Sequence, residues 1–109
     1  MIDVSNEHLK IVQDILKEQI PKSRVIAFGS RVRGTAKKFS DLDLAILGEE
    51  SIGPSEFTKL RIAFSESNLP FKVDLVEWSS ISHSFRKVIE EENFVVQDPK
   101  KISVGRGGG

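Results

Sequence analysis

The chain has 109 residues, 39% of them hydrophobic and 29% charged, which suits one compact domain and leaves too little length for a second. Its 16 Lys and Arg residues balance its 16 Asp and Glu residues, and this zero net charge argues against a protein that coats nucleic acid. The chain lacks cysteine, which excludes disulfides and thiolate metal sites. It also lacks an apolar run of the roughly 20 residues that a membrane span needs and the layout of a signal peptide, so we expect a cytoplasmic protein without membrane contact.

The first part of the chain predicts a helix, a strand and a turn in succession. Ser5 can cap a helix that runs to about Gln19 with apolar residues at helical spacing. Residues 24–28, Arg-Val-Ile-Ala-Phe, form a short β-branched and aromatic run that predicts a strand. Residues 30–40 are polar and basic, which predicts a single helical turn closed by Gly34 and then a loop.

The remaining part predicts two more strands, two more helices and a short edge strand. In chain order these are a strand at 41–47, a helix at 55–68, a strand at 71–78, a helix capped by Ser82 that runs to about Glu92, and an edge strand at 94–96. The strand at 41–47 alternates between apolar side chains on one face and Asp41, Asp43 and Ala45 on the other.

These elements predict an α/β (α+β) fold, in which a small mixed β-sheet has its helices packed on one face. The apolar face of the strand at 41–47 can meet those helices, whereas the face with the two aspartates must meet something polar. We expect the domain to span residues 1–98. Residues 99–109, a charged tail that ends in glycines, are expected to be disordered.

Paired aspartates are the first feature that indicates chemistry. Asp41 and Asp43 occupy positions i and i+2 of a strand, so both project from the same face. Like charges this close raise the pKa of at least one carboxyl group unless a cation lies between them. Oxygen ligands alone suit magnesium or manganese. The alternative is that both are surface positions on a half-exposed strand, but strands disfavour aspartate, so metal binding is the better interpretation.

Asp74 is the third candidate, because it interrupts an otherwise apolar strand and would be costly if buried without a partner. If its strand lies beside the strand at 41–47, Asp74 joins the pair. Three carboxylates around two metal ions is the arrangement that in-line phosphoryl or nucleotidyl transfer needs.

A turn of phosphate-binding type precedes the aspartates. Gly29 and Ser30 follow a strand and open a short helix, where free backbone N–H groups and the positive end of the helix favour phosphate. Four basic residues follow within eight positions and could hold a polyphosphate: Arg31, Arg33, Lys37 and Lys38. Taken alone, such a turn is more often only a turn and such a cluster a solvated loop. The aspartates about eleven residues further on favour the functional interpretation.

Two neighbouring motifs resemble the signature of the DNA polymerase β-like nucleotidyltransferase superfamily. They are Gly-Ser-Arg-Val-Arg-Gly at 29–34 and Ser-Asp-Leu-Asp-Leu at 40–44. More narrowly, the chain is similar to the minimal nucleotidyltransferase (MNT) domains, with their GSxARG and SDxDL motifs and a later strand aspartate. The resemblance spans about residues 5–98. The departure is Val32, where the family usually has alanine.

The resemblance implies the polymerase β-like fold and a binding site for ATP. Gly29 and Ser30 would hold the β- and γ-phosphates, and Arg33 would contact phosphate or brace the loop.

The resemblance also implies two magnesium ions. Asp41 and Asp43 would ligate both ions, and Asp74 would ligate the catalytic one and help to take the proton of the acceptor. Ser40 would cap or orient the aspartate strand rather than react as a nucleophile.

MNT domains lack the helical domain that positions acceptors in larger relatives, and many are encoded beside an α-helical HEPN ribonuclease toxin. They act as its antitoxin by transferring AMP from ATP to a tyrosine of the toxin. The resemblance therefore implies a protein adenylyltransferase with a HEPN-type partner. Two alternatives stay open: a free-standing transferase that acts on a small hydroxylated molecule, for which the chain has little spare length, and a non-catalytic module that neutralises its partner by binding.

Overall fold

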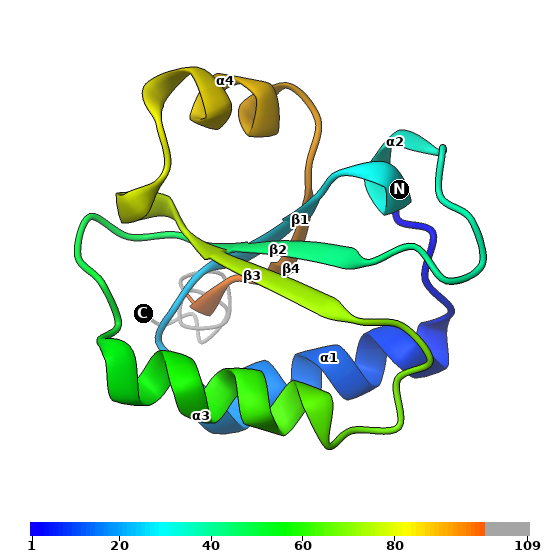
Figure 1. Ribbon diagram of the computed structural model, residues 1–109, viewed down its shortest axis with the longest axis horizontal. Helices are drawn as coiled ribbons and strands as arrows, with labels where there is room; N and C mark the ends of the chain where they lie inside the picture. The colour runs from blue at the N-terminus through cyan, green and yellow to red at the C-terminus, as the bar shows by residue number, and fades with distance from the viewer. Residues whose placement is uncertain (100–109) are drawn as a thin grey trace, which may run out of the picture.

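The computed structural model describes residues 1–99, in which a four-stranded sheet lies between helices (Figure 1). The elements are α1 (Asn6–Gln19), β1 (Val25–Phe28), α2 (Ser30–Arg33), β2 (Leu42–Ile46), α3 (Pro54–Ser65), β3 (Val73–Glu77), the 3-10 helix η1 (Trp78–Ser80), α4 (His83–Glu91) and β4 (Phe94–Gln97). All the predicted helices and strands are confirmed, and η1 is an addition. None of the described helices is long and apolar enough to cross a membrane. Of the expected disordered tail, only Pro99 lies within the described residues.

The sheet is mixed, as predicted, with the strand order β3-β2-β1-β4. β1 pairs antiparallel with β2 on one side and with β4 on the other. β2 and β3 are parallel, and α3 provides the crossover connection that a parallel pair requires. This arrangement puts β2 in the interior of the sheet, between the strand that leads into α2 and the strand that carries Asp74.

Local side-chain hydrogen bonds define where the helices begin and end. The hydroxyls of Ser5 and Ser82 each accept a hydrogen bond of 3.1 Å from the backbone N–H three residues further on, so both predicted N-caps are confirmed. α3 ends at Ser65 rather than near Asn68. The hydroxyls of Ser65 and Ser67 donate to carbonyl groups of its last turn, and such bonds compete with continuation of the helix.

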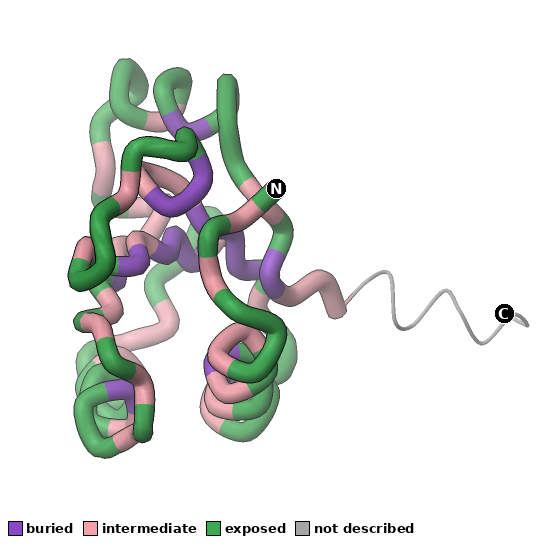
Figure 2. The backbone as a smooth tube through the Cα atoms, turned by 90° about the vertical axis from the view of Figure 1, so that its right-hand side faces the viewer, coloured by how far each residue is buried: buried purple, intermediate pink, exposed green. Residues whose placement is uncertain are grey.

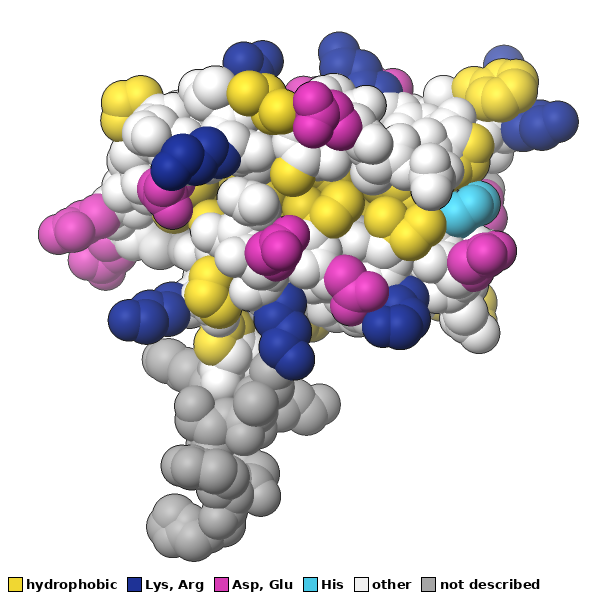
Figure 3. Space-filling model, turned by 90° about the horizontal axis from the view of Figure 1, so that it is seen from below, with side chains coloured by type: hydrophobic (Ala, Val, Ile, Leu, Met, Phe, Trp, Pro, Cys, Tyr) yellow, Lys and Arg dark blue, Asp and Glu magenta, His cyan; other side chains and the backbone are white. Residues whose placement is uncertain are grey.

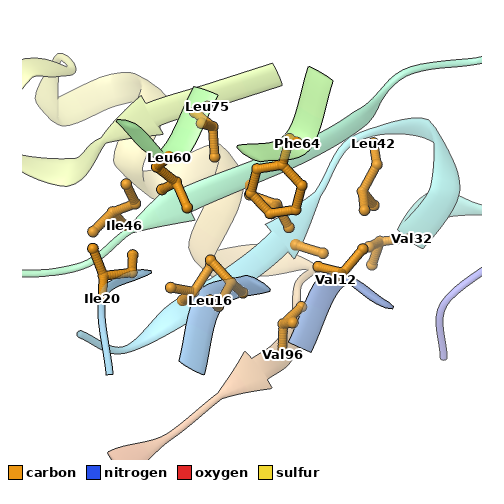
Figure 4. Packing of buried hydrophobic residues seen from close by; sticks show 13 residues of the cluster. Val12, Leu16, Ile20, Val32, Leu42, Ile46, Leu60, Phe64, Leu75 and Val96 are labelled. Carbon is orange, nitrogen blue, oxygen red and sulfur yellow. The ribbon is translucent and has the colours of Figure 1, made fainter. Parts of the chain in front are cut away.

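The main core lies between the sheet and the helices α1 and α3 (Figure 4). The apolar face of β2 points into it, as the alternation predicted, and Figure 2 shows that buried residues are concentrated in the strands. Burial of one large aliphatic side chain contributes roughly 1.5–3 kcal/mol. The largest fully buried side chains are Leu16, Leu42, Leu44, Ile46, Leu60, Ile89, Val12 and Val25. On the outside, charged side chains flank apolar ones along the surface formed by α1 and α3 (Figure 3).

The expectation that the helices pack on one face only is wrong for α4. Ile89 of α4 is buried against Ile26 of β1 and Ala45 of β2, which belong to the opposite face from the main core. Figure 1 shows α4 on the other side of the sheet from α1 and α3. Because alanine is small, Ala45 lets the helix approach the sheet closely. α4 thus covers part of the face on which the aspartates lie.

Candidate active site

The register of the sheet brings Asp43 and Asp74 together. They are Cα partners in the parallel pairing of β2 and β3, and register partners on neighbouring strands project from the same face. Asp41 lies two residues before Asp43, immediately before β2. Asp41 and Asp74 are exposed, and Asp43 is half-buried. The predicted position of Asp74 beside the aspartate pair is confirmed, whereas its role stays a prediction.

Asp43 has the strongest electrostatic signature of the site. The pKa of its carboxyl group is raised from 3.8 to about 6, first by burial and then by the neighbouring charges of Asp74 and Asp41. A carboxylate that is partly desolvated and faces two like charges is stabilised by a nearby cation. The repulsion predicted from the spacing of the aspartates is therefore present in the fold.

Gly29 lies directly against the carboxylate of Asp43. Phe28, the residue before it, is the register partner of Asp43, so the end of β1 runs beside this part of β2. A Cβ atom at Gly29 would overlap the Asp43 carboxylate oxygen. The backbone of Gly29 also has φ +82° and ψ −157°, a region that only glycine adopts readily. Only a residue without a side chain lets the turn and the aspartate come this close.

The turn after Gly29 has the form that the sequence predicts. α2 is a single turn that begins at Ser30 and is closed by Gly34, whose φ is +84°. The Gly29 carbonyl accepts hydrogen bonds of 3.0 Å from the N–H groups of Val32 and Arg33. The first N–H groups of a helix have no partner within it, so those at Ser30 and Arg31 are oriented to meet an anion. The assignment of Gly29 and Ser30 to phosphate stays a prediction.

The expectation that Arg31 helps to hold a polyphosphate by direct contact is wrong. Arg31 is buried, and its guanidinium donates to three backbone carbonyl groups. Arg33, Lys37 and Lys38 are exposed and remain able to meet phosphate. The sequence gives no sign of this difference, because all four basic residues occupy the same polar stretch and α2 is too short to show a buried face.

Ser40 has the capping role that the resemblance implies. Its hydroxyl accepts a 2.8 Å hydrogen bond from the Lys37 N–H, and its own N–H donates to the Lys37 carbonyl at 3.1 Å. These bonds form a tight turn immediately before Asp41. The capping part of the interpretation is confirmed, whereas the absence of a nucleophilic role for Ser40 stays a prediction.

The fit to a metal ion depends on ligands that the protein alone does not provide. Within residues 1–99, no group of three or more His, Cys, Asp or Glu side chains is arranged to hold a metal ion. Magnesium in nucleotide enzymes is usually held by one or two carboxylates together with phosphate oxygens and water. Asp43, with a like charge on either side and a phosphate-type turn against it, suits that mode of binding.

Comparisons with known proteins agree on one family. The family described as "Nucleotidyltransferase domain" matches residues 7–96. The "Probable protein adenylyltransferase MntA" of Haemophilus influenzae is 47% identical over 92% of this chain and 88% of its own length. The "Protein adenylyltransferase MntA" of Thermococcus cleftensis is 35% identical over 71% of this chain and 77% of its own. A chain in a crystal structure of a toxin–antitoxin with AMP-PNP superposes with a TM-score of 0.68, at 25% identity, over 92% of this chain and 80% of that one.

Proposed function

The chain belongs to the nucleotidyltransferase domain family, and we propose that it is a magnesium-dependent enzyme that transfers AMP from ATP to a hydroxyl group of a partner protein. The observation that carries this proposal is the contact between Gly29 and Asp43, with Asp74 as the register partner of Asp43. This contact brings together two parts of the site at one point on the sheet. One is a turn that suits phosphate, and the other is a set of carboxylates that suits a cation.

The residues have separable tasks in this reaction. The N–H groups at the start of α2 and the Ser30 hydroxyl bind the terminal phosphates of ATP, and the exposed Arg33 contacts phosphate or braces the loop. Asp41, Asp43 and Asp74 would hold magnesium together with phosphate oxygens of ATP, and the bound ion would neutralise the charge of the triphosphate and of the leaving pyrophosphate. Asp74 also accepts the proton of the attacking hydroxyl. The acceptor oxygen forms a bond to the α-phosphorus as the bond from that phosphorus to the bridging oxygen breaks, and pyrophosphate leaves.

We propose that the acceptor is a tyrosine of a helical HEPN-type toxin, and that this protein is the antitoxin. Two similar proteins are named as protein adenylyltransferases, and a similar chain occurs in a toxin–antitoxin crystal structure. Asp41 and Asp74 are exposed at the surface of the described residues, which suits an acceptor that docks from outside. We also propose that the protein acts in the cytoplasm, where ATP is available.

The direct test uses ATP labelled in its α-phosphate and the protein encoded beside this one. In the presence of magnesium, label and a mass increase of one or more AMP units should appear on a tyrosine of that partner, and EDTA should prevent both. The matched control is the Asp41→Asn, Asp43→Asn double variant. If that variant neutralises the partner as well as the wild type does, simple binding is the mechanism. Label that appears only on small hydroxylated compounds would instead establish the free-standing transferase.

Replacement of Asp74 separates catalysis from nucleotide binding. Asp74→Asn should lower kcat about a hundredfold and change the affinity for ATP by less than about threefold, because Asp41 and Asp43 still hold the metal of the nucleotide. Single-turnover transfer and calorimetry with ATP and magnesium measure the two quantities. Near-normal turnover would remove Asp74 from the site. Asp14→Asn, an exposed change on α1, is the control for loss of a carboxylate.

A further inference from the structure

Arg31 is the one buried charged side chain in the part of the chain that the structure describes, with only 6% of its surface exposed. Its guanidinium donates hydrogen bonds to three backbone carbonyls: from Nε to Ser40 at 2.9 Å, from Nη1 to Asp3 at 2.9 Å and from Nη2 to Lys38 at 3.1 Å. The same group lies 4.3 Å from the centre of the Phe71 ring. Burial of a charge is costly unless its donors are satisfied in this way.

The groups that Arg31 contacts come from three separate segments around the site. Lys38 and Ser40 belong to the loop that leads into Asp41, and Phe71 lies two residues before β3. Asp3 belongs to the segment before α1, and its own N–H donates back to the Arg31 carbonyl at 2.6 Å. Since Arg31 directly follows Ser30, one side chain joins the start of α2 to the segment that carries Asp41.

The loop at 37–40 has little else to hold it. Its other hydrogen bonds among the described residues lie within the turn itself, between Lys37 and Ser40. Phe39, its one large apolar side chain, is 70% exposed and so does not anchor the loop in the core. The next fixed point along the chain is Leu42, whose N–H donates to the Lys72 carbonyl at 2.9 Å.

We propose that Arg31 is a positioning residue, which fixes the loop at 37–40 and thereby sets the place of Asp41 relative to the turn at Gly29 and Ser30. The proposal deepens the proposed function and rests on it for its catalytic consequence. Arginine suits the task because its planar guanidinium offers five donors in a fixed geometry, whereas lysine offers one compact ammonium group. Arg31→Lys therefore keeps the charge and loses most of the connection between the segments.

Hydrogen exchange of the nucleotide-free protein tests the structural part. In Arg31→Lys, the Lys37 and Ser40 amides should exchange at least about tenfold faster, while the amides of α3 stay as in the wild type. The matched control is Arg86→Lys. Arg86 also donates to a backbone carbonyl, that of Trp78, from Nε at 3.0 Å and Nη2 at 2.6 Å, and it lies 5.4 Å from the Trp78 ring. Unchanged exchange at Lys37 and Ser40 would overturn the proposal.

Transfer kinetics test the positioning of Asp41. A displacement of about 1 Å in a reacting geometry can cost about a hundredfold in rate, so kcat at saturating ATP should fall by roughly 10- to 100-fold in Arg31→Lys. The magnesium concentration for half-maximal activity should rise, and the KM for ATP should change by less than about threefold. Arg86→Lys should match the wild type.

The outcomes distinguish the two proposals. If the wild-type protein transfers no AMP, the proposed function fails and hydrogen exchange still decides whether Arg31 holds the loop. If the wild type is active and Arg31→Lys speeds exchange at 37–40 without lowering kcat or weakening the magnesium dependence, the loop is tethered by Arg31 but the positioning of Asp41 is overturned.

Discussion

Replacement of Asp43 with asparagine should reduce AMP transfer by about a thousandfold while leaving the protein folded. Asp43 lies between the turn at Gly29 and its register partner Asp74, so no other side chain is placed to substitute for its charge. Loss of one strong electrostatic contact to the reacting groups typically costs 10²–10³-fold in rate, and loss of a metal ligand belongs at the upper end. Single-turnover transfer to the partner protein is the measurement.

The same variant should be more stable than the wild type at neutral pH. The pKa of Asp43 is raised to about 6 in the folded protein, so the folded state binds its proton more tightly than the unfolded chain does. The resulting stabilisation is fully present below pH about 4 and is lost as the pH rises through about 6. The full two-unit shift corresponds to roughly 3 kcal/mol, which we reduce to about 1 kcal/mol because the carboxylate is half-exposed and screened.

Thermal unfolding without metal or nucleotide tests this expectation. At pH 7.5, Asp43→Asn should raise the Tm by about 5 °C, because 1 kcal/mol shifts the Tm of a domain of this size by roughly 4–8 °C. At pH 4 the two proteins should unfold at nearly the same temperature. The control is Asp14→Asn, which changes an exposed carboxylate on α1. A lower Tm for Asp43→Asn at neutral pH would show that the carboxylate stabilises the fold and that repulsion is not its dominant interaction.

Much of the site could be predicted from the sequence because its signals are local. Alternation along β2 fixes the face of Asp43, and glycine followed by serine after a strand indicates the turn at Gly29. Even the neighbourhood of Asp74 follows from topology, since one intervening helix between two strands suits a parallel crossover that brings them side by side.

The features that the sequence did not reveal depend on contacts between distant segments. α4 packs on the aspartate face of the sheet because Ala45 and Ile26 offer it an apolar patch. Only one residue of this nine-residue helix, Ile89, is buried, so the sequence pattern of the helix does not indicate which face of the sheet it covers. The role of Arg31 depends on the backbone carbonyl groups of Asp3, Lys38 and Ser40. Every residue has a backbone carbonyl group, so the sequence does not indicate which of them accept these hydrogen bonds.

Gly29→Ala should damage both stability and activity. The added Cβ would overlap the Asp43 carboxylate, and the backbone of residue 29 occupies a region that alanine adopts only with strain. Strain of this kind costs about 1–3 kcal/mol, and relief of the overlap requires Asp43 or the turn to move. We expect the free energy of unfolding to fall by about 2–4 kcal/mol and AMP transfer to fall at least a hundredfold, since both contributors to the site shift together.

Gly53→Ala separates the strain from the overlap. Gly53, at the start of α3, has φ +96° and ψ 153°, in the same glycine-favouring region, and a Cβ there meets nothing within 4 Å. It should therefore lose stability through strain alone and keep near-normal transfer at temperatures where it is folded. In a background of Asp43→Ala, which removes the overlapping carboxylate, Gly29→Ala should cost about as much stability as Gly53→Ala does. An equal cost of Gly29→Ala with and without the Asp43 side chain would show that the two residues are not coupled, and the contact between them could then no longer support the proposed site.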